Sequence, residues 1–351
     1  MTMQKSTRQP GKKNIGMLLL KGRTFIALFV LFIVFSIICP TFLLPSTLLM
    51  IAKHVALYGI LAIGMTYVII TAGIDLSVGS VVALVGMASG MLITRGVTIR
   101  VFGVCIYPPV WSIVLICLLL GAVVGWVNGI FITRFNVAPF IATLGTMYIC
   151  SGLASLVSQG STISGLKGQA ILGNTGFEVF GASTMGVPNA AIILLVFTLI
   201  AAFVLKKTPF GWHLLATGGN EKAALLSGLK VKKVKISAYI ISGVCAAVVG
   251  IITASQLQAA NPNNGSGWEM NAIAAVVLGG TSMSGGVGTV GGSIVGAFVI
   301  GVLNDGMVMS GVSEYWQKII RGAVIILAVI IDQVQNRMQA KIALEQREML
   351  K

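Results

Sequence analysis

Residues 192–205 read IILLVFTLIAAFVL, and residues 25–39 read FIALFVLFIVFSIIC. Both runs are apolar almost throughout, whereas a strand of a membrane barrel alternates polar and apolar residues over about ten positions. Continuous apolar runs are typical of helices that cross a bilayer. Of all 351 residues, 56% are hydrophobic and 9% are charged, and the mean hydropathy is +0.96. Because an average soluble domain is about 25% charged, this composition excludes a soluble enzyme, a disordered chain and a fibrous repeat, and it predicts an all-α polytopic membrane protein.

The apolar runs predict about ten membrane spans. Spans three and eight are short and interrupted by glycine, so we expect each of them to be broken or to cross only in part. A basic segment, 1–23, precedes the transmembrane domain, 24–332, and a more charged tail, 333–351, follows it. The predicted spans are 24–42, 54–73, 79–94, 110–132, 139–158, 189–205, 236–257, 271–283, 288–310 and 315–332.

The distribution of basic residues predicts the orientation of the chain. The net charge of +15 would suggest nucleic-acid binding in a soluble protein, but here the 24 Lys and Arg residues lie mainly between apolar runs. With the N-terminus in the cytoplasm, 18 of them lie inside, five lie outside and Arg321 lies within the last span, as the positive-inside rule requires. We therefore expect a bacterial inner-membrane protein with both termini cytoplasmic and no nucleic-acid partner. The loop 159–188 is then external, and 206–235 is the longest cytoplasmic loop. No small-residue cleavage site follows the first span, which predicts a retained anchor.

Glycine spacing suggests an internal repeat. Spans four and nine each carry a small residue at every fourth position, which leaves one helix face nearly bare for close helix packing. They are the fourth spans of the first and second five, so an inverted repeat of five plus five spans would relate them. The alternative is that glycine, with 43 residues, is simply common in this chain. The predicted helix-packing residues are Gly121, Gly125, Gly129, Gly288, Gly292 and Gly296.

A first polar motif, GIDLSVGS at 73–80, lies between spans two and three. Asp75 is the one acidic residue among the first 177, and an acid at the membrane edge is costly unless other groups hold it. In a structural interpretation, Asp75 or Ser77 caps the start of span three. In a functional interpretation, both lie near a substrate path or an inner gate.

A second polar motif, 277–290, reads VLGGTSMSGGVGTV. This stretch is unsuited to a lipid-facing helix, and unwound backbone at membrane depth needs protein or a wet cavity around it. Thr281, Ser282 and Ser284 are therefore candidates for a gate or path, with a tight interhelical turn as the alternative. Asn304, a polar residue inside span nine, is a further path candidate. The chain has no GxxxxGK[ST] phosphate-binding loop.

A third motif, 218–230, lies in the long cytoplasmic loop and predicts a short capped helix. Asn220 can cap its start, with Glu221 in the first turn, and Gly228 can end it. Ala224 is expected to be exposed, ready to contact a partner. The alternative is a helix that rests on anionic membrane lipid.

No set of residues in the sequence points to catalysis or to a metal. The five cysteines lie in or beside apolar runs without a CxxC pair, and the two histidines, His54 and His213, lie far apart. We therefore expect no catalytic residue, no metal site and no cofactor on this chain.

Five blocks, in the same order, resemble the permease subunit of bacterial ribose-type simple-sugar ABC importers. They are GIDLSVGS (73–80), FNVAPFIATLGTM (135–147), TPFG…AxGGNxxAAxxSG (208–228), LGGTSMSGGVGTVGG (278–292) and YWQKIIRGAVIILAV (315–329). The resemblance covers about residues 24–332. It implies a path for a neutral sugar, a second permease chain, identical or related, and a periplasmic sugar-binding protein. It also implies a cytoplasmic ATP-binding subunit that carries the ATP and Mg, so this chain would not itself be an enzyme.

The same resemblance assigns a coupling helix, which sits in a groove of the ATPase, to Asn220–Gly228. The predicted coupling residues are Gly219, Asn220, Glu221, Ala223, Ala224 and Gly228. Two alternatives remain open at this point. One is a permease for branched-chain amino acids, whose zwitterionic substrates should require a fixed charge or a helix end in the path. The other is an ion-coupled secondary carrier, which would usually need a buried acidic relay.

Overall fold

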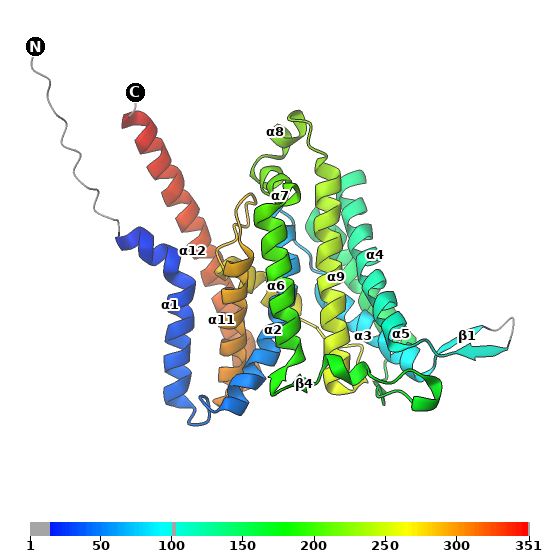
Figure 1. The fold of residues 1–351 in the computed structure, drawn as a ribbon. Coiled ribbons are helices and arrows are strands. Elements are labelled where there is room, and N and C mark those ends of the chain that lie inside the picture. Colours follow the sequence, from blue (N-terminus) through cyan, green and yellow to red (C-terminus); the bar gives the residue numbers. More distant parts are fainter. Residues whose placement is uncertain (1–14, 100–102, 350–351) are drawn as a thin grey trace, which may run out of the picture.

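Helices make up most of the structure, a computed structural model that describes residues 15–99 and 103–349 (Figure 1). The described helices are α1 (Ile15–Ile38), α2 (Pro45–Ile70), α3 (Val78–Thr94), α4 (Val110–Arg134), α5 (Pro139–Ser158), α6 (Asn189–Lys207), α7 (Pro209–Gly219), α8 (Glu221–Leu226), α9 (Val231–Leu257), α10 (Trp268–Leu278), α11 (Val290–Met309) and α12 (Glu314–Met349). The all-α prediction is therefore confirmed.

Six of these helices, α2, α4, α5, α6, α9 and α11, are long and apolar enough to cross a membrane. Shorter apolar helices correspond to the predicted first, third and eighth spans: Thr24–Ile38 within α1, α3 with 17 residues and α10 with 11. At 1.5 Å per residue, α10 is only about 17 Å long, so the expectation of short third and eighth spans is confirmed. The predicted boundary at 332 falls inside α12, which continues as one helix to Met349.

The core lies around α2, α9 and α11, most of whose residues are buried, whereas only about a quarter of the residues of α4, α5 and α6 are buried. α9 packs against α2, α3 and α4, and α2 packs against α6, α10 and α11. α3 also contacts α4 and α5, and α10 contacts α11 and α12. Each short helix is thus enclosed by long ones, which is what an interrupted span requires in lipid.

The two glycine sets pack against different kinds of partner. A Cβ on Gly125 would meet the carbonyl oxygen of Tyr239, so the face of α4 that carries Gly121, Gly125 and Gly129 lies directly on α9. Gly292 and Gly296 face α10 instead. Gly288 was predicted inside the ninth helix but precedes it, because α11 begins at Val290. The glycine face of α4 therefore packs on α9 and that of α11 on the end of α10, and the repeat stays a prediction.

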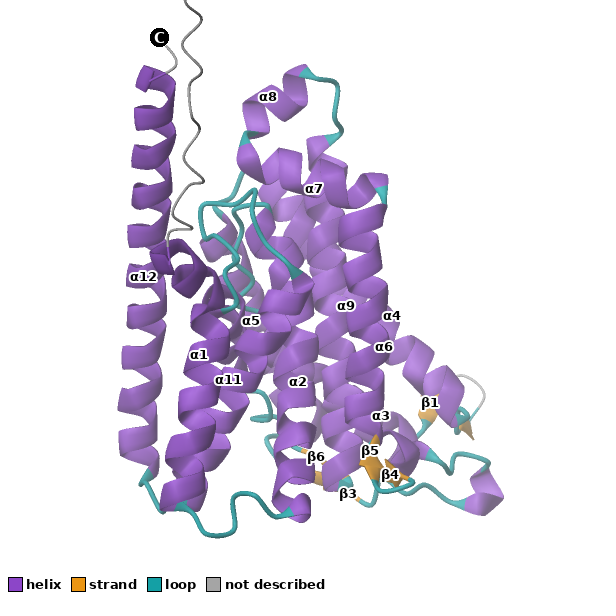
Figure 2. Cartoon of the chain, turned by 60° about the vertical axis from the view of Figure 1, so that its left-hand side comes forward, coloured by secondary structure: helices purple, strands orange, loops and turns teal. Residues whose placement is uncertain are grey.

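Short strands gather at the end of the bundle opposite to α7 and α8 (Figure 2). A hairpin pairs β1 (Val97–Ile99) with β2 (Val104–Ile106), and β3 (Ile163–Ser164) pairs with β6 (Ala259–Ala260). β4 (Ser183–Thr184) pairs with β5 (Val187–Pro188), and two 3₁₀ turns, Ala170–Leu172 and Phe177–Phe180, complete the 159–188 segment. This segment and α8 therefore lie at opposite ends of the bundle, as the predicted orientation requires.

We predict that the α8 end is cytoplasmic. In a chain with the exposed Cys105 replaced by serine, an impermeant maleimide added to spheroplasts should label Ser164→Cys and leave Ser227→Cys unlabelled. Both positions are exposed in the structure, so a difference in labelling reports sidedness. Labelling of Ser227→Cys alone would show that the chain has the opposite orientation.

A candidate transport path between two broken helices

The connection between α2 and α3 folds back into the bundle around Asp75. Its carboxylate accepts hydrogen bonds from the Ser77 backbone N–H (3.0 Å), the Ser77 hydroxyl (2.6 Å) and the Ser242 hydroxyl of α9 (2.7 Å). Asp75 is 1% exposed, so these bonds offset part of the cost of burying it. Asp75 thus accepts from the Ser77 N–H just before α3, but the N-terminus of α3 itself has no side-chain capping bond, and the functional interpretation stays a prediction.

A chain of hydrogen bonds extends from Ser77 to the two neighbouring helices. The Asn128 amide of α4 donates to the Ser77 hydroxyl (2.9 Å), and its oxygen accepts from the Thr146 hydroxyl of α5 (2.7 Å). The hydroxyls of Thr143 and Tyr239 both point at the Ile74 carbonyl. The 71–77 connection is therefore fixed to α4, α5 and α9.

Helices α3 and α10 both begin inside the bundle, and the chain reaches their first residues from opposite ends of the bundle. Ser242, the partner of Asp75, lies 11 residues into α9, about 17 Å from the start of that helix. Trp268 is the first residue of α10, and the centroid of its ring lies 5.7 Å from the centroid of the Tyr58 ring. Tyr58 lies 13 residues into α2, about 20 Å along that helix. The two starts touch, because a Cβ on Gly79 would meet Gly265 and the Glu269 carboxylate.

A pocket of about 180 Å³ opens where these two starts meet α5. Hydroxyls, amides and one carboxylate provide most of its polar lining. The lining residues are Gly79, Ser80, Ala83, Met147, Tyr148, Ser151, Pro262, Asn263, Asn264, Ser266 and Glu269. Of the predicted path candidates, Asp75 and Ser77 lie just before α3, whose first turn lines this pocket, but neither lines it.

The other path candidates lie elsewhere. Thr281, Ser282 and Ser284 form a tight turn, in which the Ser282 N–H donates to the Val287 carbonyl (3.0 Å) and the Ser284 N–H to the Ser282 hydroxyl (3.3 Å). Asn304 lies on α11 and is 8% exposed, away from this pocket. Its neighbour Asp305 pairs with His54 of α2 at 2.8 Å. The structure therefore separates the predicted path residues into three places.

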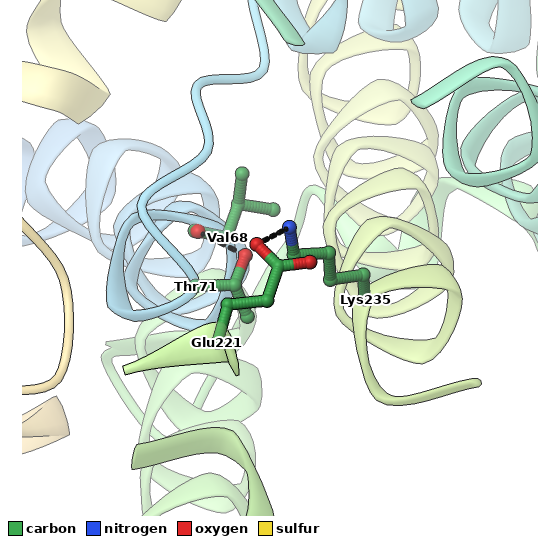
Figure 3. A network of polar contacts seen from close by, with 4 residues as sticks. All are labelled: Val68, Thr71, Glu221 and Lys235. Atoms are coloured by element: carbon green, nitrogen blue, oxygen red, sulfur yellow. Dashed lines mark hydrogen bonds and ion pairs between the residues drawn. The ribbon is translucent and has the colours of Figure 1, made fainter. Parts of the chain in front are cut away.

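Helix α8 matches the predicted capped helix. The Asn220 side chain accepts from the Ala223 N–H (3.0 Å), and Gly228 has a φ of +82° just beyond the end of the helix. Lys235 of α9 holds Glu221 at 2.7 Å (Figure 3). The expectation that Ala224 is exposed is wrong, because the chain folds back after α8 and the Leu229 N–H bonds to the Ala224 carbonyl. Ala224 is 5% exposed, whereas Leu226 is 89% exposed.

The end of α7 connects this helix to two of the other motifs. A Cβ on Gly218 would meet the carbonyl oxygen of Ile70, the last residue of α2. The same carbonyl accepts from the Gly286 N–H (2.9 Å), in the turn after α10. Gly285 lies against Gly218 and Ala72. We call this meeting point of 70–72, 218–219 and 285–286 the glycine junction.

Most residues of the pocket were not predicted from the sequence. The 261–269 segment reads NPNNGSGWE, a polar stretch between two apolar runs that contains one of only nine acidic residues. An acidic residue in a short polar segment between apolar runs could have marked this site, as it marked Asp75. Tyr148 and Ser151 carry no such signal, because they are two of several hydroxyl-bearing residues spread along α5.

Comparison with known proteins identifies the family. A sequence model described as "Branched-chain amino acid transport system / permease component" matches residues 47–329. The chain belongs to this permease family. It is 44% identical over 313 residues to the ribose import permease RbsC of Bacillus subtilis, covering 89% of this chain and 92% of that protein. It is 38% identical to RbsC of Escherichia coli K12, with 90% and 94% covered, and 37% identical to the galactose/methyl galactoside import permease MglC of that strain, with 92% and 97% covered.

These relatives confirm the resemblance drawn from the five sequence blocks. The family description includes the branched-chain amino-acid alternative, but the named relatives are sugar import permeases. No solved structure matches the chain.

Proposed function

We propose that this chain is the membrane permease subunit of an ATP-driven importer and forms the path for a neutral, ribose-type sugar. The observation that carries the proposal is a pocket of hydroxyls and amides between two broken helices, in a chain whose relatives are named as ribose and galactose import permeases. A periplasmic binding protein delivers the sugar. A separate cytoplasmic subunit binds ATP and Mg and hydrolyses the ATP.

An inverted repeat would relate the two broken helices whose starts line this pocket. The contacts of α4 with α9 and of α3 with α9 correspond to those of α11 with α2 and of α10 with α2. The contacts of α3 with α4 and α5 correspond to those of α10 with α11 and α12. These matches support a repeat that relates α2–α5 to α9–α12 within ten spans. In such repeats, substrate sites form near the midplane, where interrupted helices begin.

A second permease chain covers the pocket. Tyr148 and Ser151 of α5 line it and are themselves exposed. Lipid cannot satisfy a polar pocket at membrane depth, so another protein surface must close this side. A second copy or a related permease, facing α5, would enclose the path between the two chains.

Helix α8 transmits the work of ATP hydrolysis. Its exposed Leu225 and Leu226 suit an apolar groove on the ATP-binding subunit. Movement of α8 would reach the glycine junction through α7, and from there the 71–77 connection that carries Asp75. The proposed route therefore runs from the cytoplasmic partner to the start of α3, which lines the pocket.

The amino-acid alternative is less well supported by the pocket. A zwitterion needs a free positive group for its carboxylate, and a helix N-terminus could supply one. Here each helix start already has a carboxylate: Asp75 takes the Ser77 N–H before α3, and Glu269 lies in the first turn of α10. Neutral hydroxyl groups fit this arrangement better than a second carboxylate.

The test of this proposal is uptake into proteoliposomes that contain the permease, ATPase and binding protein. We expect Leu226→Arg to lower ATP-dependent ribose uptake about tenfold or more, because burying a leucine contributes about 1.5–3 kcal/mol. Stimulation of the ATPase by loaded binding protein should fall in parallel. Leu226→Met, which keeps an apolar side chain, should retain both. Normal coupling in Leu226→Arg would exclude α8 as the transmitting contact.

A further inference from the structure

The two helix starts at the pocket each carry a carboxylate, but the carboxylates differ in their surroundings. Asp75 is buried and fully engaged by Ser77 and Ser242. Glu269 instead lines the pocket. A residue needed only to balance the α10 dipole would not have to face a cavity.

The groups around Glu269 are neutral. Among the residues that line the pocket in the described part of the chain, Glu269 is the one charged side chain, and no lysine, arginine or histidine faces it. The others that present hydrogen-bonding groups are Ser80, Ser151, Ser266, Asn263, Asn264 and Tyr148. This set can accept and donate hydrogen bonds to several hydroxyls of one ligand. An anion in the same place would meet the carboxylate without a compensating cation.

The position of Glu269 is also fixed. A Cβ on Gly79 would meet one of its carboxylate oxygens, so the carboxylate lies against the backbone of α3. The glycine leaves room for this contact. The charge is therefore held at the wall of the pocket, where α3 and α10 meet.

We propose that Glu269 determines selectivity inside the path: its carboxylate accepts hydrogen bonds from the hydroxyls of a neutral polyhydroxyl substrate and repels anionic sugars such as sugar phosphates. The inference rests on the proposed function and adds a selective site within the permease itself. The sugar then meets a second selection step after its release from the binding protein.

The test measures the charge of the pocket with cysteine reagents. In the reconstituted importer with Cys105→Ser, a Ser151→Cys variant is labelled with a cationic and with an anionic methanethiosulfonate. We expect the ratio of cationic to anionic labelling rates to fall about tenfold on Glu269→Gln, since the variant removes one nearby charge. Glu178→Gln, which neutralises an exposed acid in the external 159–188 segment, should leave the ratio unchanged.

A second measurement tests the ligand class. Ribose at millimolar concentration should slow labelling of Ser151→Cys by a neutral methanethiosulfonate, whereas ribose 5-phosphate should not. In Glu269→Gln, ribose 5-phosphate should also protect. An unchanged charge ratio, or equal protection by both ligands with Glu269 present, would overturn the inference. If the unsubstituted importer takes up no sugar with ATP, the proposed function fails instead, whatever the labelling ratio.

Discussion

Replacing Gly125 by leucine should leave no folded permease in the membrane. A Cβ at this position would meet the carbonyl oxygen and carbon of Tyr239, which are backbone atoms that no side-chain rotation can move away. The same face of α4 places Gly121 against the Gly243 carbonyl, so the two helices touch backbone to backbone along this line. Leucine would separate them, and overpacking of this kind costs about 1–3 kcal/mol, occasionally more.

The cost at Gly125 would extend to the site. Tyr239 also directs its hydroxyl at the Ile74 carbonyl, and Ser242, one turn further along α9, holds Asp75. Displacing α9 from α4 therefore breaks the network that fixes the start of α3. Against a total stability of about 5–15 kcal/mol, the combined loss should prevent folding.

Gly152→Leu is the matched control. Gly152 lies on α5 with nothing within 4 Å of an added Cβ, so the variant chain should fold. The measurement is monodispersity and thermal unfolding of the detergent-extracted permease. A folded Gly125→Leu variant with unchanged unfolding temperature would contradict the packing of α4 on α9. Because α5 faces the proposed second chain, Gly152→Leu is instead expected to reduce pairing of the permeases.

The sequence predicts the parts of this fold that depend on local patterns. Apolar runs locate the helices, the short third and eighth spans follow from interrupted runs, and Asn220 is recognisable as a cap because capping depends on neighbouring residues. Asp75 was identifiable for a similar reason, since an isolated acid among apolar residues needs specific partners. Its hydrogen bond to the Ser77 N–H is local.

The parts that could not be predicted depend on contacts between distant segments. The pocket brings together α3, α5 and 262–269, and no local pattern fixes which face of α5 turns towards it. Ala224 is buried because Leu229 folds back onto α8, and a six-residue helix is too short to show a periodic apolar face. The glycine junction was equally hidden, because it joins three glycine-containing motifs that lie far apart in the sequence.

Gly218 gives the sharpest test of that junction, because its neighbour Gly219 is a built-in control. A Cβ on Gly218 would meet the Ile70 carbonyl oxygen and the Gly286 nitrogen, whereas a Cβ on Gly219 has nothing within 4 Å. Gly218→Ala should therefore push the end of α7 off α2 and strain the hydrogen bond from Gly286 to Ile70.

We expect this strain to destabilise by about 3 kcal/mol the state in which α7 contacts α2 and the turn after α10, so that uptake falls about a hundredfold. Gly219→Ala should transport normally. The measurement is ribose uptake together with ATPase stimulation by loaded binding protein, in complexes that still contain all their subunits. The junction links α8 to the 71–77 connection and to the turn after α10, so one methyl group here should affect both broken helices at once. If Gly218→Ala behaves like Gly219→Ala, force does not pass through these backbones, and the route from the ATPase to the pocket must follow α9 instead.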